Sequence, residues 1–105
     1  LLYMICVDGR DRVIKSKFIG AGVKELAVAH REIVSEVLAT NASGVILAHN
    51  HPNGILKPSE DDIYATKSIE EILGALSIKL IDHFIFCDND YISILNNHSF
   101  NIIKK

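Results

Sequence analysis

The sequence is poor in the residues that build several common kinds of small protein. Among 105 residues there is no tryptophan, one methionine and only two cysteines, Cys6 and Cys87, far apart and outside any Cys-x-x-Cys pair. A cysteine zinc knuckle is therefore excluded, and two buried thiols in a reducing compartment are favoured over a disulfide, which stays open. No apolar run is long enough to span a bilayer. We expect a cytoplasmic protein without a membrane partner.

The sequence also lacks an excess of either charge. Its 11 Lys and Arg stand against 13 Asp and Glu, which gives a formal net charge of −2. A dedicated nucleic-acid binder usually carries a basic excess, so charge does not support DNA as a partner. The first residues contain no basic leader and no small-residue cleavage site, as a secretory signal would require. Since residue 1 is not Met, we expect residues 1–105 to be one domain from a longer protein.

Strand and helix patterns alternate along the chain. Two segments have helical apolar spacing; their apolar positions are Ile33, Val34, Val37 and Leu38 in the first and Ala65, Ile69, Ile72, Leu73 and Leu76 in the second. The predicted elements are strands at 1–7 and 13–19, a helix at 30–40, a strand at 44–48, a helix at 59–76, and strands at 77–86 and 90–95. This order indicates an α/β fold: a single mixed-sheet domain packed by helices.

Two histidines follow the predicted strand 44–48, in the sequence HNHPNG. Side chains alternate faces along a strand, so His49 and His51 point to the same side. Pro52 ends the pairing of the strand because it has no N–H. Ligands of α/β folds bind at such carboxyl ends of central strands. Paired neutral imidazoles suit a divalent transition metal, zinc above all, and a catalytic zinc needs a third protein ligand and one open position.

Three acidic residues, Glu60, Asp61 and Asp62, begin the next helix. Ser59-x-x-Asp62 is a capping-box pattern with Ser59 as the N-cap. Helical phase weakly prefers Asp62 as the carboxylate nearest to the apolar stripe, with Asp61 next and Glu60 facing away. Turn and capping chemistry explains each part of the pattern alone. It does not explain two polar rings beside an apolar run, because buried polar groups need partners.

The combined pattern resembles a known family. HNHPNG followed by Ser59-x-x-Asp62 is similar to the JAMM metalloprotease signature, H-x-H-x7-S-x2-D, and the HNHP form resembles the RadC family over nearly the whole sequence. The resemblance implies an MPN-type fold related in outline to cytidine deaminases. It also implies a single zinc ion held by His49, His51 and Asp62, with Ser59 at the oxyanion of a tetrahedral intermediate. Family members often carry an upstream helical region, which we expect this sequence to lack.

The family pattern further implies a general-base glutamate at the position immediately before Leu1, and the sequence does not contain it. Glu32 and Glu36 are the internal substitutes. We expect both to be solvated, since they lie off the apolar face of helix 30–40. His30 stands where the family often has proline, and we expect it to be an exposed residue at the helix start.

The pair Asp82-His83 lies in the strand predicted at 77–86. The resemblance implies a supporting role for this pair. The two side chains point to opposite faces of the strand, so only one can reach the site. A hydrogen bond that orients a ligand imidazole is one interpretation. An ordinary core or surface position is the other, and the sequence does not decide between them.

Three functions remain open. The first is a zinc-dependent hydrolase that acts on a peptide or isopeptide bond of a peptide or protein substrate. The second is a RadC-type protein linked to DNA repair. The third is a zinc-stabilised, non-catalytic interaction module, as inactive MPN domains are. A deaminase is disfavoured because the sequence has neither H-x-E nor P-C-x-x-C. The sequence does not fix the oligomeric state.

Overall fold

The computed structural model describes residues 2–19, 26–51 and 55–95, with side chains in the first helix described from Ala29 onward. The element order agrees with the sequence-based prediction. The elements are β1 (Leu2–Val7), β2 (Val13–Ile19), α1 (Leu26–Thr40), β3 (Gly44–Asn50), α2 (Glu60–Ala75), β4 (Lys79–Cys87) and β5 (Asp90–Ser93).

The strands form one five-stranded sheet in the order β2-β1-β3-β4-β5. Among the strands of the described residues, β3 and β4 pair in parallel and the other neighbouring pairs are antiparallel. Helix α2 makes the crossover that a parallel pair requires. The predicted fold class, a mixed sheet packed by helices in a single domain, is confirmed.

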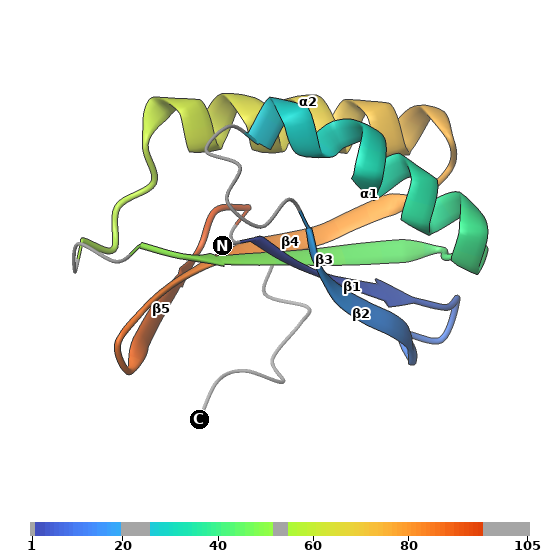
Figure 1. Ribbon diagram of the computed structural model, residues 1–105, viewed down its shortest axis with the longest axis horizontal. Helices are drawn as coiled ribbons and strands as arrows, with labels where there is room; N and C mark the ends of the chain where they lie inside the picture. The colour runs from blue at the N-terminus through green and yellow to red at the C-terminus, as the bar shows by residue number, and fades with distance from the viewer. Residues whose placement is uncertain (1, 20–25, 52–54, 96–105) are drawn as a thin grey trace.

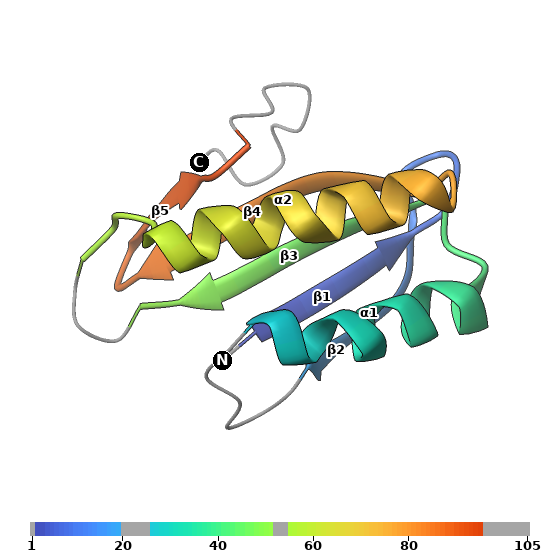
Figure 2. The same cartoon turned by 90° about the horizontal axis from the view of Figure 1, so that it is seen from above.

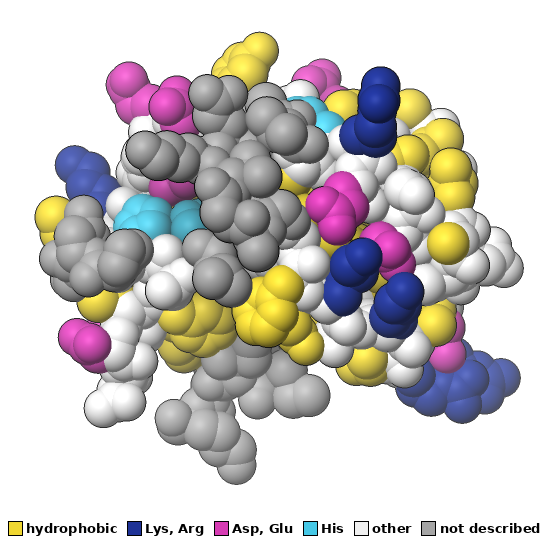
Figure 3. Space-filling view, in the orientation of Figure 1, with side chains coloured by type: hydrophobic (Ala, Val, Ile, Leu, Met, Phe, Trp, Pro, Cys, Tyr) yellow, Lys and Arg dark blue, Asp and Glu magenta, His cyan; other side chains and the backbone are white. Residues whose placement is uncertain are grey.

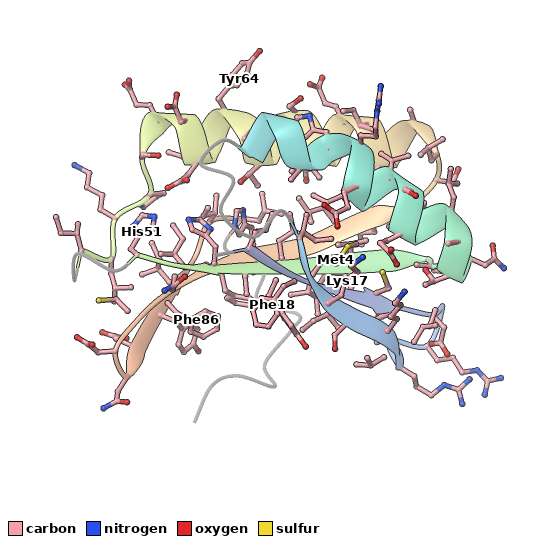
Figure 4. All side chains as sticks on the ribbon, in the orientation of Figure 1. Met4, Lys17, Phe18, His51, Tyr64 and Phe86 are labelled. Atoms are coloured by element: carbon pink, nitrogen blue, oxygen red, sulfur yellow. The ribbon has the colours of Figure 1, made fainter. Side chains whose placement is uncertain are left out.

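Both helices lie side by side over the same face of the sheet (Figures 1 and 2). The main core fills the space between them and the strands, and Met4 lies in this layer (Figure 4). Phe18 and Phe86 lie on the opposite face, and Tyr64 points away from the sheet into solvent (Figure 4). The fully buried large apolar residues are Met4, Val7, Ile19, Ile33, Val37, Val45, Leu47, Ile69, Leu73 and Ile85.

Three apolar positions of the predicted helix stripes are exposed to solvent. Leu38 is 61% exposed, and Ile72 and Leu76 are exposed to 37% and 43%. Each helix rests on the sheet along a narrow line, which Ile33 and Val37 occupy in α1. A periodicity of 3.6 residues gives the direction of a buried face but not its width.

The ends of the elements also differ from the prediction. Helix α1 begins at Leu26, four residues before the predicted start, so His30 lies inside the helix and is partly buried instead of exposed. Strand β3 continues to Asn50, which includes His49 in the ladder, and β5 ends at Ser93. Element ends depend on caps and pairing partners more than on apolar spacing.

A bulge in β4 fixes which side chains face the helices. Val45 pairs with Leu80, but Ile46 pairs with Asp82, so Ile81 is one extra residue in β4. In a regular ladder Ile81 would pair with Ile46, and Asp82 would then stand opposite Leu47 and face the helices. With the bulge, His83 pairs with Leu47 and faces them instead. Bulges of this kind re-aim a side chain by shifting the phase of a strand.

Candidate metal centre

The carboxyl end of β3 supplies two imidazoles. His49 pairs with Leu2 of β1 and Ile85 of β4, which fixes its backbone on both sides. The backbone N–H of His51 donates to the carbonyl of Phe86 at 2.9 Å, so the chain is still held one residue beyond the strand. Asn50 between them is exposed. Both histidines therefore point to the helix side of the sheet, as the alternation of a strand requires, and His51 can be followed in Figure 4.

The first turn of α2 supplies a carboxylate. Ser59 is the N-cap of the helix, and Asp62 is the third helical residue of a complete capping box. The Ser59 N–H donates to Asp62 Oδ2 at 2.9 Å, and the Asp62 N–H donates to Ser59 Oγ at 3.0 Å. Glu60 and Asp61 are exposed, whereas the Asp62 side chain is only 14% exposed. The cap turns one of three neighbouring carboxylates toward the histidines.

His49, His51 and Asp62 converge on one point. The two Nε2 atoms lie 3.1 Å apart, His51 Nε2 lies 3.1 Å from Asp62 Oδ2, and His49 Nε2 lies 3.5 Å from Asp62 Oδ1. One ligand atom from each residue falls within 4.8 Å of the others. Tetrahedral zinc with ligands at about 2.0–2.1 Å separates them by about 3.3–3.4 Å. The two nitrogens approach different oxygens of the Asp62 carboxylate. The three side chains are close enough to hold one metal ion, and their donor types suit zinc.

Orientation and charge agree with this interpretation. His51 Nδ1 lies 3.0 Å from the carbonyl oxygen of Ile55, which can only accept, so Nδ1–H donates and the other nitrogen faces the cluster. Burial lowers the pKa of His49 and favours the neutral ring that binds metal. Burial by itself raises the pKa of Asp62, but hydrogen bonds from Ser59 and the nearby histidines outweigh it, and the pKa is lowered overall. Histidine side chains reach the surface beside an acidic group on the left of Figure 3.

Behind His49 lies a second buried layer that sequence reasoning covered only in part. His83 Nε2 lies 2.7 Å from His49 Nδ1, and His83 Nδ1 lies 2.8 Å from Thr66 Oγ1. Burial lowers the pKa of His83 to about 3. Thr66 was not predicted. Its position four residues after Asp62 is the available signal, because a helical threonine can hydrogen-bond the carbonyl of residue i−4.

Asp82 lies on the opposite face of the sheet from the cluster. Its carboxylate accepts from Ser93 Oγ at 2.5 Å and from the Leu95 N–H at 3.2 Å. Of the pair Asp82-His83, the histidine is therefore the residue that reaches the candidate centre. Asp82 instead ties the end of β5 to β4.

Ser59 stands at the edge of the cluster as the N-cap. Its hydroxyl oxygen accepts from the Asp62 N–H, and this bond leaves the hydroxyl proton available for a second partner. The capping role and a contact with a substrate oxygen can therefore hold at the same time.

The internal glutamates lie elsewhere. Glu36 is not solvated as expected: its side chain is 15% exposed and lies 3.0 Å from Lys15 and 3.1 Å from Lys17. Glu32 lies 3.5 Å from Lys17. Both carboxylates face β2 through these lysines, so neither joins the histidine cluster. Cys6 and Cys87 are buried free thiols.

Comparisons with known proteins agree with the fold and the cluster. The model of the RadC-like JAB domain family matches residues 1–99. A UPF0758 protein of Photobacterium profundum is 38% identical over 94 residues, which cover 89% of this chain and 42% of the relative. A UPF0758 protein of Vibrio vulnificus is 37% identical over 92 residues, 87% of this chain and 41% of the relative.

The chain spans about two-fifths of the length of these curated relatives. In residues 26–51 and 55–95, no helix combines the length and apolar character needed to cross a membrane. With its mixed sheet, its two helices and a matched region that includes the His49–His51–Asp62 cluster, the chain belongs to the RadC-like JAB domain family.

Proposed function

We propose that this domain is a zinc-dependent hydrolase of a peptide or isopeptide bond. The observation that carries the proposal is the convergence of two imidazole nitrogens and one carboxylate oxygen within 4.8 Å. Two histidines and one carboxylate are a known ligand set of catalytic zinc, and three protein ligands leave one position open. Imidazole ligands favour zinc over magnesium or calcium, which prefer oxygen.

Each residue has a distinct part in the proposed reaction. His49, His51 and Asp62 would hold the ion, and bound zinc supplies a Lewis acid that lowers the pKa of water to about 7. The Ser59 hydroxyl, fixed by its capping bond, would donate to the carbonyl oxygen of the substrate as negative charge develops there. Asp62 Oδ2 also accepts from the Ser59 N–H, so the cap and the candidate ligand set each other's position.

The pairing of β1 supports the expected place of the general base. Leu2 pairs with His49 and Tyr3 with Ala48, so each step back along β1 is one step forward along β3. If the same register continued, the position immediately before Leu1 would fall opposite His51 and on the same face as His49. A glutamate there would stand beside the candidate ligands, within reach of a proton on the attacking water.

The experiment that tests the metal centre is elemental analysis of the purified domain after dialysis. We expect about one zinc per chain in the wild type and none in the His49→Ala, His51→Ala double variant. Asn50→Ala is the matched control, because Asn50 lies between the two histidines and is exposed. Absence of zinc from the wild type at neutral pH, even when zinc is supplied, contradicts the proposal.

Hydrolysis is tested separately on a mixed set of peptide and isopeptide substrates, with and without a glutamate added directly before Leu1. Zinc-dependent cleavage that appears or rises with the added glutamate supports the hydrolase. A zinc-loaded domain that cleaves nothing in either form would favour the non-catalytic interaction module. Salt-dependent binding of DNA would instead favour the link to DNA repair.

A further inference from the structure

A chain of hydrogen bonds runs from the backbone of α2 to the candidate ligand His49. Thr66 Oγ1 lies 2.6 Å from the carbonyl oxygen of Asp62 and 2.8 Å from His83 Nδ1. His83 Nε2 in turn lies 2.7 Å from His49 Nδ1. Thr66 and His83 are fully buried, so water does not compete for these bonds. The two elements that carry the candidate ligands, β3 and α2, are thus joined through β4.

The direction of every bond in this chain follows from its first member. A carbonyl oxygen can only accept, so the single proton of the Thr66 hydroxyl points to Asp62 O. Thr66 Oγ1 must then accept from His83, which places the proton of the neutral His83 ring on Nδ1. His83 Nε2 is left with a lone pair and accepts from His49 Nδ1–H. His49 therefore presents the lone pair of Nε2, the nitrogen that faces His51 and Asp62.

We propose that Thr66 and His83 are positioning residues that fix His49 in the one tautomer able to bind a metal through Nε2. The proposal rests on the metal centre proposed above. His51 is held in the same tautomer by one bond, because the carbonyl oxygen of Ile55 can only accept a hydrogen bond from Nδ1–H. A histidine partner has no such fixed polarity, since either nitrogen of its ring can carry the proton. The Thr66 hydroxyl therefore determines which nitrogen of His83 carries the proton.

Removal of the Thr66 hydroxyl frees His83 to carry its proton on Nε2. That proton would donate to His49 Nδ1 and move the proton of His49 to Nε2, where it blocks metal binding. Loss of a group that orients a metal ligand typically weakens affinity by about 10–100-fold. A merely structural Thr66 would lower stability without changing which nitrogen of His49 is protonated.

The test reads the tautomers directly, by two-bond proton–nitrogen NMR correlations of the metal-free, ¹⁵N-labelled domain at neutral pH. In the wild type we expect the proton of His49 and of His83 on Nδ1. In Thr66→Val we expect His83 and His49 to shift toward the other tautomer, and Thr66→Ser to retain the wild-type pattern. A wild-type His49 protonated on Nε2 overturns the proposal without any variant. An unchanged pattern in Thr66→Val overturns it as well.

Zinc affinity from competition with a chelator supplies the second readout. We expect Thr66→Val to bind zinc about 10–100-fold more weakly and Thr66→Ser to stay within about threefold of the wild type. Thr40→Val is the matched control. The Thr40 hydroxyl, in α1, also donates to the carbonyl oxygen four residues earlier, that of Glu36. Equal affinities of Thr66→Val and Thr40→Val would refute the positioning role.

His83 offers a test that does not depend on the folding of Thr66→Val. In His83→Gln, the amide oxygen can accept from His49 and the amide N–H can donate to Thr66, so zinc affinity should be largely retained. In His83→Leu, it should fall as in Thr66→Val. A wild-type chain that binds no zinc but has both tautomers as expected would reject the metal centre alone. Correct tautomers with unchanged zinc affinity in His83→Leu would reject the positioning role alone.

Discussion

Ser59 and Asp62 each accept a hydrogen bond from the backbone of the other. The bond to Asp62 ends on Oδ2, and the same oxygen lies 3.1 Å from His51 Nε2. The oxygen that caps α2 is thus also the oxygen that faces the candidate metal. The stability of the helix start and the geometry of the cluster depend on the same few atoms.

Ser59→Ala removes one of the two capping bonds and should lower the free energy of unfolding by about 1 kcal/mol, the usual effect of losing an N-cap. Ser59→Thr keeps a capping hydroxyl and should lose much less. Urea denaturation of the metal-free domain measures both. Equal stability of Ser59→Ala and the wild type would mean that the cap contributes nothing here.

Asp62→Asn should weaken zinc binding by more than about 100-fold, because it replaces a ligand carboxylate by a neutral amide. Asp61→Asn removes the same charge from the same helical turn but from an exposed position, so its zinc affinity should stay within about threefold. Chelator competition compares the two variants. A similar loss in both would mean that the charge of the helix start matters, and not coordination by Asp62.

The metal-free domain should lose stability as the pH falls from about 6.5 toward 3. The pKa of His83 is lowered from 6.5 to about 3 by burial, so below pH 6.5 the unfolded chain binds a proton that the folded ring does not. The free energy of unfolding therefore decreases with falling pH across this window and is at its full value above it. His49 acts in the same direction, and the lowered pKa of Asp62 adds a further loss below its usual value of 3.8.

This pH dependence amounts to a few kcal/mol, since each unit of pKa shift corresponds to about 1.4 kcal/mol. Urea denaturation at several pH values, with a chelator present, measures it. His83→Gln removes the titrating ring and should flatten the slope between pH 6.5 and 4. If the slope of this variant equals that of the wild type, His83 is not the source of the effect.

Two glycine substitutions should change stability in opposite directions. A Cβ on Gly44 would lie 3.0 Å from Ile81 Cδ1 and 3.1 Å from Val7 Cγ2, two buried side chains, so Gly44→Ala should cost about 1–3 kcal/mol. A Cβ on Gly74 would have no atom within 4 Å, and Gly74 lies in α2. Gly74→Ala should therefore stabilise by about 0.5–1 kcal/mol. Urea denaturation tests both, and a loss in each would refute the second prediction.

The order of the elements could be predicted from local pattern, whereas the complete set His49, His51 and Asp62 was predicted from the resemblance to the JAMM signature. Alternation put His49 and His51 on one face, and helical phase weakly preferred Asp62 among three acidic neighbours. Both are short-range rules that hold wherever a strand or a helix start forms. The candidate ligands lie at a strand end and at a helix start, which these rules cover. Their approach to one another depends on how the crossover packs α2 against the sheet.

The second buried layer could not be predicted in full because it depends on pairing between strands. No residue near Ile81 is a sequence signal for the bulge. Because of the bulge, His83 faces the helices and Asp82 does not. In the sequence Thr66 looks like any helical residue, because its role depends on the contact with His83. The burial of Glu36 likewise depends on two lysines of β2, which are distant in sequence.

The β3–α2–β4 crossover carries the whole cluster, from His49 at its start to His83 near its end. A parallel pair closes only after the helix between its strands has been laid across the sheet, which makes such contacts slow to form. In an unfolded chain His49 and His51 are two residues apart in sequence, whereas Asp62 lies 11 residues beyond His51. The third ligand and the buried layer arrive together when the crossover closes. In a refolding experiment, the rate of tight zinc binding would therefore report the rate at which β3 pairs with β4. The β1–β2 hairpin could form earlier without changing this rate.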